Sequence, residues 1–428
     1  MRKKMLGISV VSVIAIAIGV AIFASISLAD TLDLRTVSGH TVWEFRRNGS
    51  EIVHYLFENN SHRVLATEFV DDQNGGWMGL TFDIDNFNLQ NPNPLNALVH
   101  QTESTVLGMS SNYQTDETNV VWDEKHDQQS GDPRFDKIKM YNYNTDTTTT
   151  IESYPYPSTV SVHSPWVSGN YVVYVRKPTS TSITSVYLYN ISTQTSSRIS
   201  PQSTAATSPK IKGNYVCWLD YRNEATTGID IYGYDISTQQ EFTVTTASGN
   251  QYLFFMNDRY VLFKGAETAT DHNNMGVYVF DLQNKTTTTI TTSEINEARM
   301  SSGSNADNTY VCWDEKVTNN NGTFWAVAYK KVSDNQPTFI TDTSTLDYHQ
   351  VPDMITQSYV GWEKGVCKNA MGVPYLYKMS NQTHTQLDEN TCIGSSIIID
   401  NSWIMWTRFR HNEGNNYEEF NICGCALP

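Results

Sequence analysis

The chain has 428 residues, of which 39% are hydrophobic, 12% are aromatic and only 17% are charged. Its formal net charge of −16 at pH 7 argues against a nucleic-acid partner, because an acidic surface repels phosphate backbones. Abundant Thr, Ser, Asn and aromatic residues favour strands and tight turns over helices. The composition therefore predicts an all-β protein.

Residues 1–29 are typical of a targeting segment. A basic start at residues 2–4 precedes an apolar stretch, and Ser27–Ala29 places small residues where signal peptidase requires them. The apolar stretch, about 24 residues, is also long enough to span a bilayer as a helix. Cleavage after Ala29, retention as an N-terminal membrane anchor and a prepilin-like signal all stay open. The first two place residues 30–428 outside the cell, secreted or held at its surface.

One short pattern then recurs along the chain: two apolar residues, an aromatic residue and one or more charged residues. We call its aromatic position the box aromatic. From Trp122 onward it returns every 44 to 52 residues, after a longer first interval of 79. The eight box aromatics are Trp43, Trp122, Tyr174, Trp218, Phe263, Trp313, Trp362 and Trp406.

Each copy continues with an alternating strand, a turn, a Thr-rich strand and a short apolar strand, as in residues 229–246. Four short strands in a repeat of roughly 45 residues are the signature of a β-propeller blade. The box aromatics are then structural residues that fill the wedge between neighbouring blades. The motif count predicts eight four-stranded blades. Seven is the alternative, if residues 31–38 complete the last blade instead of founding their own.

Residues Pro209–Asn223 and Asp230–Thr238 resemble the TolB-like β-propellers and, more closely, the propeller repeats of archaeal cell-surface proteins. The resemblance extends over nearly all of the chain after the leader, but only this blade matches tightly. Tyr174 and Phe263, for example, replace Trp in two other blades. The resemblance implies an extracellular propeller used in surface layers, adhesion or recognition, and it supplies no catalytic residues.

Residues 70–108 do not fit the repeat and predict a loop insertion. Loops longer than about 12–15 residues in a compact domain are usually functional or disordered. Because this one is rich in aromatic residues, we expect it to form a ligand-binding surface at one mouth of the propeller. The candidate ligand-binding residues are Trp77, Met78, Phe82, Asp83, Asp85 and Phe87.

We expect no cofactor and no metal site. The only cation considered is Ca²⁺, because the spacing of Asp83 and Asp85 matches the start of a calcium loop. The later ligands, the glycine and the terminal Glu of such a loop are missing.

The charged residues that follow the box aromatics occupy equivalent places in the blades. They either line one mouth of the channel, where they would bind cations or sugars, or fix turns and pair with the next blade. A feature repeated in every blade is more typical of architecture, which is what we expect. The group comprises Glu44, Asp123, Glu124, Asp220, Arg222, Asp314, Glu315, Glu363 and Arg408.

Four of the six cysteines fall in the last two blades, and export permits disulfides. We expect Cys367 or Cys392 to bridge to Cys423 or Cys425 and secure the C-terminal blade. Cys217 and Cys312 replace apolar residues before their box aromatics, and a further blade separates them. They are expected to be buried free thiols. The six cysteines are Cys217, Cys312, Cys367, Cys392, Cys423 and Cys425.

Enzyme signatures such as Gly-x-Ser-x-Gly, His-Glu-x-x-His and a phosphate-binding glycine loop are absent from the sequence. The sequence therefore predicts a non-enzymatic propeller for recognition, adhesion or scaffolding, with a glycan or another surface protein as partner. One alternative is a polysaccharide-acting lyase or glycoside hydrolase with its site in the central channel, for example at His126, His163, Asp220 and Arg222. The other is a structural subunit of a surface lattice.

Overall fold

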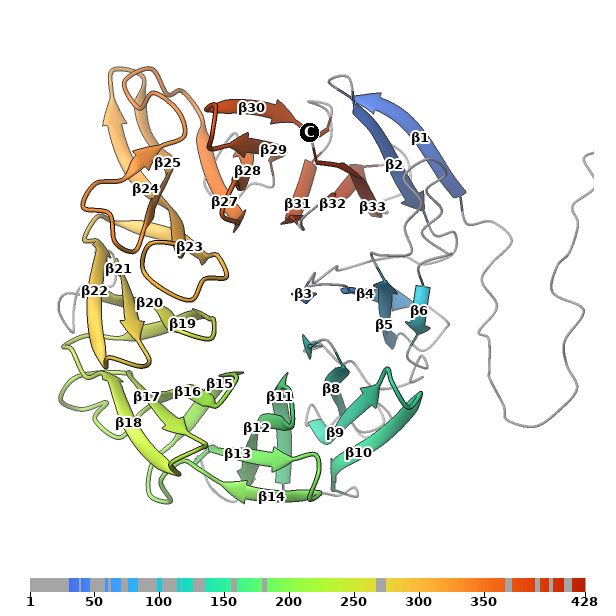
Figure 1. Ribbon diagram of the computed structural model, residues 1–428, viewed down its shortest axis with the longest axis vertical. Helices are drawn as coiled ribbons and strands as arrows, with labels where there is room; N and C mark the ends of the chain where they lie inside the picture. Colours follow the sequence, from blue (N-terminus) through green and yellow to red (C-terminus); the bar gives the residue numbers. More distant parts are fainter. Residues whose placement is uncertain are drawn as a thin grey trace, which may run out of the picture.

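The computed structural model is a ring of antiparallel β-sheets (Figure 1). It describes residues 31–37, 40–46, 58–60, 63–70, 76–83, 98–101, 114–116, 118–125, 135–154, 160–178, 183–266, 275–365, 372–388, 393–399, 403–411 and 418–427. Within these residues the strands form seven four-stranded sheets and one five-stranded sheet. The prediction of an all-β fold built from four-stranded antiparallel sheets is therefore confirmed.

Short strands follow one another along the described part of the chain. They are β1 (Thr31–Val37), β2 (His40–Arg46), β3 (Glu58–Asn60), β4 (Arg63–Val70), β5 (Gly76–Asp83), β6 (Leu98–Gln101), β7 (Gln114–Thr115), β8 (Asn119–Lys125), β9 (Phe135–Asn142), β10 (Thr147–Ser153), β11 (Val160–Ser168), β12 (Tyr171–Pro178), β13 (Ser185–Asn190), β14 (Thr195–Arg198), β15 (Ala206–Lys212), β16 (Tyr215–Asp220), β17 (Asp230–Asp235), β18 (Gln240–Thr245), β19 (Gln251–Met256), β20 (Tyr260–Ala266), β21 (Met275–Asp281), β22 (Thr286–Thr291), β23 (Ile295–Met300), β24 (Tyr310–Asn319), β25 (Gly322–Lys331), β26 (Thr338–Phe339), β27 (His349–Ile355), β28 (Tyr359–Gly365), β29 (Val373–Lys378), β30 (Thr383–Gln386), β31 (Ile393–Ile399), β32 (Trp403–His411) and β33 (Glu418–Ala426).

Seven sheets each contain four strands that follow one another in the chain, from β3–β6 to β27–β30. The first strand of each sheet lies nearest the centre of the ring and the fourth lies at the rim, as β15 and β18 show (Figure 1). We call the first strands the inner strands. They carry the residues that can meet at the centre of the ring.

The two ends of the chain close the ring in one sheet, whose order is β31-β32-β33-β2-β1. Glu44 lies opposite Cys423 and Phe45 lies opposite Ile422. The N-terminal strands therefore complete the last sheet, which corrects the assignment of Trp43 to the second strand of a first blade. A ring needs such a closing contact because an open edge strand leaves backbone groups unpaired.

The segment expected to be a long loop contributes two strands. β5 pairs with β4 and β6 pairs with β5, and together with β3 they form one sheet. Trp77, Met78, Phe82 and Asp83 lie on β5. The other two candidates in this segment, Asp85 and Phe87, lie outside the described residues. The assignment of these residues to a ligand surface stays a prediction.

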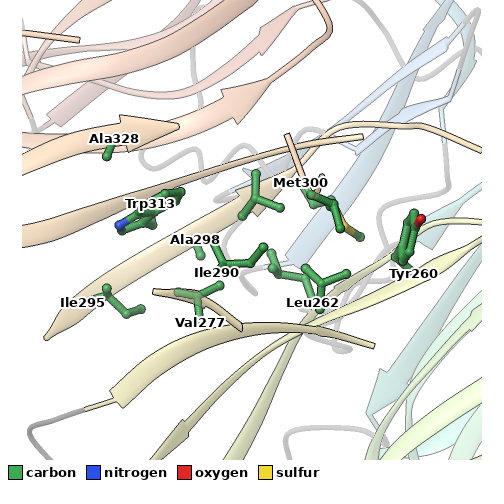
Figure 2. Packing of buried hydrophobic residues seen from close by; sticks show 12 residues of the cluster. Tyr260, Leu262, Val277, Ile290, Ile295, Ala298, Met300, Trp313 and Ala328 are labelled. Atoms are coloured by element: carbon green, nitrogen blue, oxygen red, sulfur yellow. The ribbon is translucent and has the colours of Figure 1, made fainter. Parts of the chain in front are cut away.

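Apolar side chains from adjacent sheets fill the wedges between them. Figure 2 shows one such cluster, in which Leu262 and Val277 of one sheet pack against Ala298, Met300 and Trp313 of the next. All box aromatics whose side chains are described are at most 5% exposed, and each comes from the second strand of its sheet. They are Trp122, Tyr174, Trp218, Phe263, Trp313, Trp362 and Trp406.

The cysteines only partly follow the expectation. Cys217, Cys312 and Cys425 are buried free thiols, so the bridge expected through Cys425 is not formed. Burial raises the pKa of Cys312 and of Cys425 to about 12, which makes both thiols unreactive. Cys367 and Cys392 lie outside the described residues.

Residues 1–30, where the leader is expected, also lie outside the described residues. In the part of the chain that the structure describes, no helix has the length and apolar character needed to cross a membrane.

Candidate active site on the inner strands

The acidic residues two positions after the box aromatics have an architectural role. The indole Nε1 of Trp122 donates to Glu124 at 2.9 Å, and that of Trp218 donates to Asp220 at 2.9 Å. Trp313 and Glu315 repeat the bond at 2.8 Å. A buried indole N–H needs an acceptor, and these carboxylates supply it from the same strand.

Asp220 and Arg222, named as candidates for a lyase or glycosidase, are committed to each other. Arg222 donates from Nε and Nη2 to the two carboxylate oxygens of Asp220, and from Nη1 and Nη2 to Glu241. Its guanidinium also lies 3.6 Å from the ring centroid of Tyr232. Four of its five N–H donors are therefore used within its own sheet, so this stacked arginine positions its own hairpin.

Of the two histidines of that alternative, the structure describes only His163. His163 lies on β11, where its Nδ1 is 3.0 Å from the hydroxyl of Ser164. Burial and the nearby Lys177 lower its pKa, so the ring is neutral at pH 7. His126 lies outside the described residues.

The acidic residues directly after the box aromatics bind bulges in the inner strands. Asp314 Oδ1 accepts the backbone N–H groups of Asn296 and Glu297 at 2.9 and 2.7 Å, where the register of β23 shifts. Asp123 likewise accepts the N–H of Ser164 at 2.9 Å, at the shift in β11. A bulge frees backbone donors from the ladder, and a buried carboxylate satisfies them.

Glu363 holds the same position after its box aromatic but behaves differently. It is only 6% exposed, accepts the N–H of Gly372 at 3.1 Å and interacts electrostatically with the carboxyl group of Asp353. Asp353 lies at the bulge of β27 and is half-buried. Two carboxyl groups in contact cannot both be ionised cheaply, so the pair holds a proton.

The pKa values of this pair follow from its surroundings. Burial, and after it the charge of Asp353, raise the pKa of Glu363 well above its usual value. Burial also raises the pKa of Asp353, to about 6, although Arg299 opposes this shift. Both shifts favour the protonated form, so the pair holds a proton at a pH at which isolated carboxyl groups would both be ionised.

Arg299 on β23 joins this pair to the neighbouring sheet. Its Nε donates to the main-chain carbonyl of Asp353 at 3.0 Å, and its Nη1 donates to Glu297 at 2.8 Å and to the carbonyl of Ala298 at 3.0 Å. Among the described residues Nη2 has no hydrogen-bond partner, and the side chain is 37% exposed. The guanidinium thus keeps donors for an anion from solution.

Together, these residues form a compact site on the inner strands β23 and β27 and on β28, the second strand of its sheet. It contains one arginine with an unused donor, one carboxylate with a pKa near 6 and one neutral carboxyl group. Within the described residues no three His, Cys, Asp or Glu side chains are placed to hold a metal ion. The arrangement can bind a carboxylate group and move a proton beside it.

Sequence reasoning named only Glu363 of these residues, and it named it as architecture. Arg299, Asp353 and Glu297 carry no motif. One signal was present in the chain: the repeats place Lys364 where Trp122, Trp218 and Trp313 have their indole acceptor.

Comparisons with known proteins give the fold but no family. No protein-family model matches the chain, and no curated protein matches it. An oligogalacturonate lyase from Vibrio parahaemolyticus is similar in structure, with 9% identity and a TM-score of 0.52, over 93% of this chain and 97% of that chain. A prolyl endopeptidase matches with 9% identity and a TM-score of 0.52, over 85% of this chain.

This chain spans 55% of the length of that prolyl endopeptidase. TolB from Acinetobacter baumannii also matches, with 13% identity and a TM-score of 0.35, over 77% of this chain and 80% of that chain. That score is too low to carry an argument. The predicted β-propeller fold agrees with these likenesses, whereas no match supports the archaeal cell-surface repeats.

The predicted absence of enzymatic activity needs correction. Two solved structures that match with a TM-score of 0.52 are a lyase and a peptidase, so this fold is one that enzymes use. Neither structure supports the predicted non-enzymatic role in recognition, adhesion or scaffolding. At 9% identity they transfer no residue, so the site must be argued from the chain itself.

Proposed function

We propose that the chain is an eight-bladed propeller lyase that cleaves an acidic polysaccharide, with Arg299, Asp353 and Glu363 as its catalytic residues. The observation that carries the proposal is an arginine with an unused donor that is bonded to the backbone of Asp353, whose carboxyl group interacts with that of Glu363. These groups match the two needs of uronate elimination, which are an anchor for the sugar carboxylate and a base beside it.

The chemistry balances within this set. The carboxylate of Asp353 takes the proton from the sugar carbon next to the uronate carboxylate. The bond from the adjacent carbon to the glycosidic oxygen breaks, a carbon–carbon double bond forms, and the departing oxygen takes the proton of Glu363. Arg299 pairs with the uronate carboxylate, where negative charge builds as the proton leaves.

The geometry favours elimination over hydrolysis. Retaining glycosidases hold their two carboxyl groups about 5–5.5 Å apart, and inverting ones hold them at about 6.5–9.5 Å. Asp353 and Glu363 instead interact with each other as a buried carboxyl pair, an arrangement suited to exchanging a proton. The proposal of a lyase also draws on the extent of one likeness, because the oligogalacturonate lyase corresponds to this chain over 97% of its own length.

The net charge of −16 does not oppose an acidic substrate at this site. At physiological ionic strength charges are screened over about 8 Å, so the groups next to the substrate decide its binding. The proposal places the enzyme outside the cytoplasm, exported through the leader, where such polysaccharides would be met.

The test is the ultraviolet absorbance of the unsaturated uronate product. The full chain is incubated with polygalacturonate, with alginate and with a neutral glucan. We expect absorbance to rise with one of the two uronate polymers, to stay flat with the glucan, and to be lost in Asp353→Asn. The matched control is Arg259→Gln, which alters an arginine paired with Asp281 in another sheet. A folded protein that releases no unsaturated product from either uronate polymer would overturn the proposal.

A further inference from the structure

Two exposed aromatic side chains lie on the inner strand next to that of Arg299. Of the large hydrophobic residues whose exposure the structure describes, only Tyr252 and Phe255 are exposed, at 37% and 38%. Both belong to β19, whose sheet directly precedes that of β23. Single exposed apolar residues are common on protein surfaces and indicate nothing. Two exposed aromatic rings on one strand near the centre of the ring indicate a ligand-binding surface instead (Figure 1).

A bulge presents both rings on one face of the sheet. Tyr252 lies opposite Lys264 and Phe255 lies opposite Leu262, with the register shift between Leu253 and Phe255. Lys264 and Leu262 are two residues apart on β20 and therefore share a face. Leu262 packs into the cluster that includes β23, so this face is turned toward the sheet of Arg299 (Figure 2).

The same face carries a positive charge. Lys264 directly follows its box aromatic, where three other sheets have the acidic residues Asp123, Asp314 and Glu363. Its Nζ lies 5.8 Å from the Tyr252 ring centroid and 3.4 Å from the main-chain oxygen of Asn296 at the β23 bulge. The cation therefore lies between the aromatic pair and the sheet of Arg299.

Phe255 and Arg299 also occupy matching positions in their sheets. Each lies opposite the residue that precedes the box aromatic, Leu262 for Phe255 and Cys312 for Arg299. Residues in the same register of neighbouring inner strands lie at similar heights around the ring. A chain of sugars that has one unit at Arg299 can thus place a neighbouring unit at Phe255.

From these contacts we infer a second sugar subsite, formed by Tyr252, Phe255 and Lys264, for the uronate unit adjacent to the one cleaved. The inference rests on the proposed function and names its substrate as an acidic oligosaccharide of several units. The apolar faces of a pyranose ring stack on Tyr252 and Phe255, and its carboxylate lies near Lys264. Aromatic contacts supply area at low entropic cost, and the cation selects uronate over neutral sugar.

The experiment measures KM and kcat of Phe255→Ala and Tyr252→Ala with galacturonate oligomers of increasing length. We expect KM to rise about two- to tenfold for the longer oligomers, with kcat changed less, because each ring contributes stacking beyond its buried area. Phe255→Tyr, which keeps the ring, should restore KM. Phe324→Ala, which removes an aromatic ring from β25, should leave KM unchanged. Equal KM values for Phe255→Ala and the unaltered chain at every length would overturn the subsite.

Binding separates this inference from the lyase proposal. Calorimetric titration of Asp353→Asn with galacturonate oligomers needs no turnover. If Phe255→Ala in that background weakens binding while no variant shows elimination, the subsite stands and the lyase proposal fails. If elimination occurs and Phe255→Ala leaves binding unaltered, the lyase stands and the subsite fails.

Discussion

Arg299 donates from Nε to the main-chain carbonyl of Asp353 at 3.0 Å, a bond that joins two neighbouring inner strands. The acceptor belongs to the same residue whose carboxylate is proposed as the base. The arginine therefore fixes the backbone of the bulge from which the Asp353 side chain projects, and it keeps Nη2 for the substrate.

Replacing Arg299 tests both roles. We expect Arg299→Gln to lower kcat/KM on a uronate polymer about a hundredfold or more, since a donor aimed at developing charge is worth that much. Arg299→Lys should recover part of the activity only, because it keeps the charge but lacks the planar fork. Steady-state rates of product absorbance measure both variants, and equal rates for Arg299→Gln and the unaltered chain would contradict the assignment.

The proposed reaction has a bell-shaped pH dependence. Asp353 must be ionised, so activity should rise as the pH passes about 6. Glu363 must hold its proton, so activity should decline at higher pH, when the pair loses that proton. Rates measured across pH 4 to about 10 test this. In Glu363→Gln, whose side chain has no titrating proton, we expect the decline in rate at high pH to be absent. A flat profile between pH 5 and about 8 would count against proton transfer by this pair.

Stability should depend on pH through Asp314. Burial raises the pKa of Asp314 to about 7 in the folded chain, so the folded state holds a proton that the unfolded chain releases near pH 4. The resulting stabilisation is complete below about pH 4 and is lost as the pH rises to about 7, a loss of roughly 4 kcal/mol. Asn keeps the acceptor oxygen for Asn296 and Glu297 but cannot ionise.

Urea unfolding of the unaltered chain and of Asp314→Asn between about pH 4 and 8 measures this difference. We expect the variant to lose less stability than the unaltered chain over the interval. The same loss in both proteins would assign the pH dependence to other groups.

Two tryptophans form a matched pair for the indole hydrogen bond. Trp218 donates to the buried Asp220, whereas Nε1 of Trp362 has no hydrogen-bond partner within the described residues. Both rings are at most 2% exposed, so Trp→Phe removes a similar volume at each position. Trp218→Phe should therefore cost about 1–3 kcal/mol more than Trp362→Phe, the value of a hydrogen bond to a charged group. Denaturation midpoints of the two variants give the difference, and equal costs would show that the bond to Asp220 contributes nothing.

Ring closure predicts a positional effect of proline. β2 is paired on both sides, with β33 and with β1, whereas β1 is an outer strand. Glu44→Pro should lower the melting temperature strongly because it removes a backbone donor from a strand between two others. Leu32→Pro, on the outer strand, should be tolerated better. Circular dichroism on heating tests both, and an equal effect would argue against closure through β2.

Much of the ring could be predicted because one local rule repeats. A large apolar ring with an acceptor two residues later, as in Trp218 and Asp220, marks the second strand wherever it occurs. Trp43 has similar sequence neighbours, but it lies on β2, which pairs with β33 in the closing sheet. Local sequence could not show this, because the closing pair depends on which strand edges are left unpaired in the ring. The sheet of β3–β6 was missed for the opposite reason, because it lacks a box aromatic on its second strand, β4.

The candidate site could not be predicted because it depends on spatial neighbours. Asp353 and Arg299 lie 54 residues apart, and the bulges of β23 and β27 place them together. Glu363 directly follows its box aromatic, as Asp314 does, and its interaction with Asp353 comes from a strand that the local sequence does not identify. No periodicity in the chain reports such a contact.

The sheet that joins β33 to β2 also sets a constraint on how the molecule folds. Its strands come from opposite ends of the chain, so this pairing has the largest loop-closure entropy in the fold. Sheets built from consecutive strands can form as soon as their hairpins are complete, but the ring stays open until the last strand is available. Folding should therefore end with a slow step of circularisation, in which the last strand pairs with a strand formed near the other end of the chain.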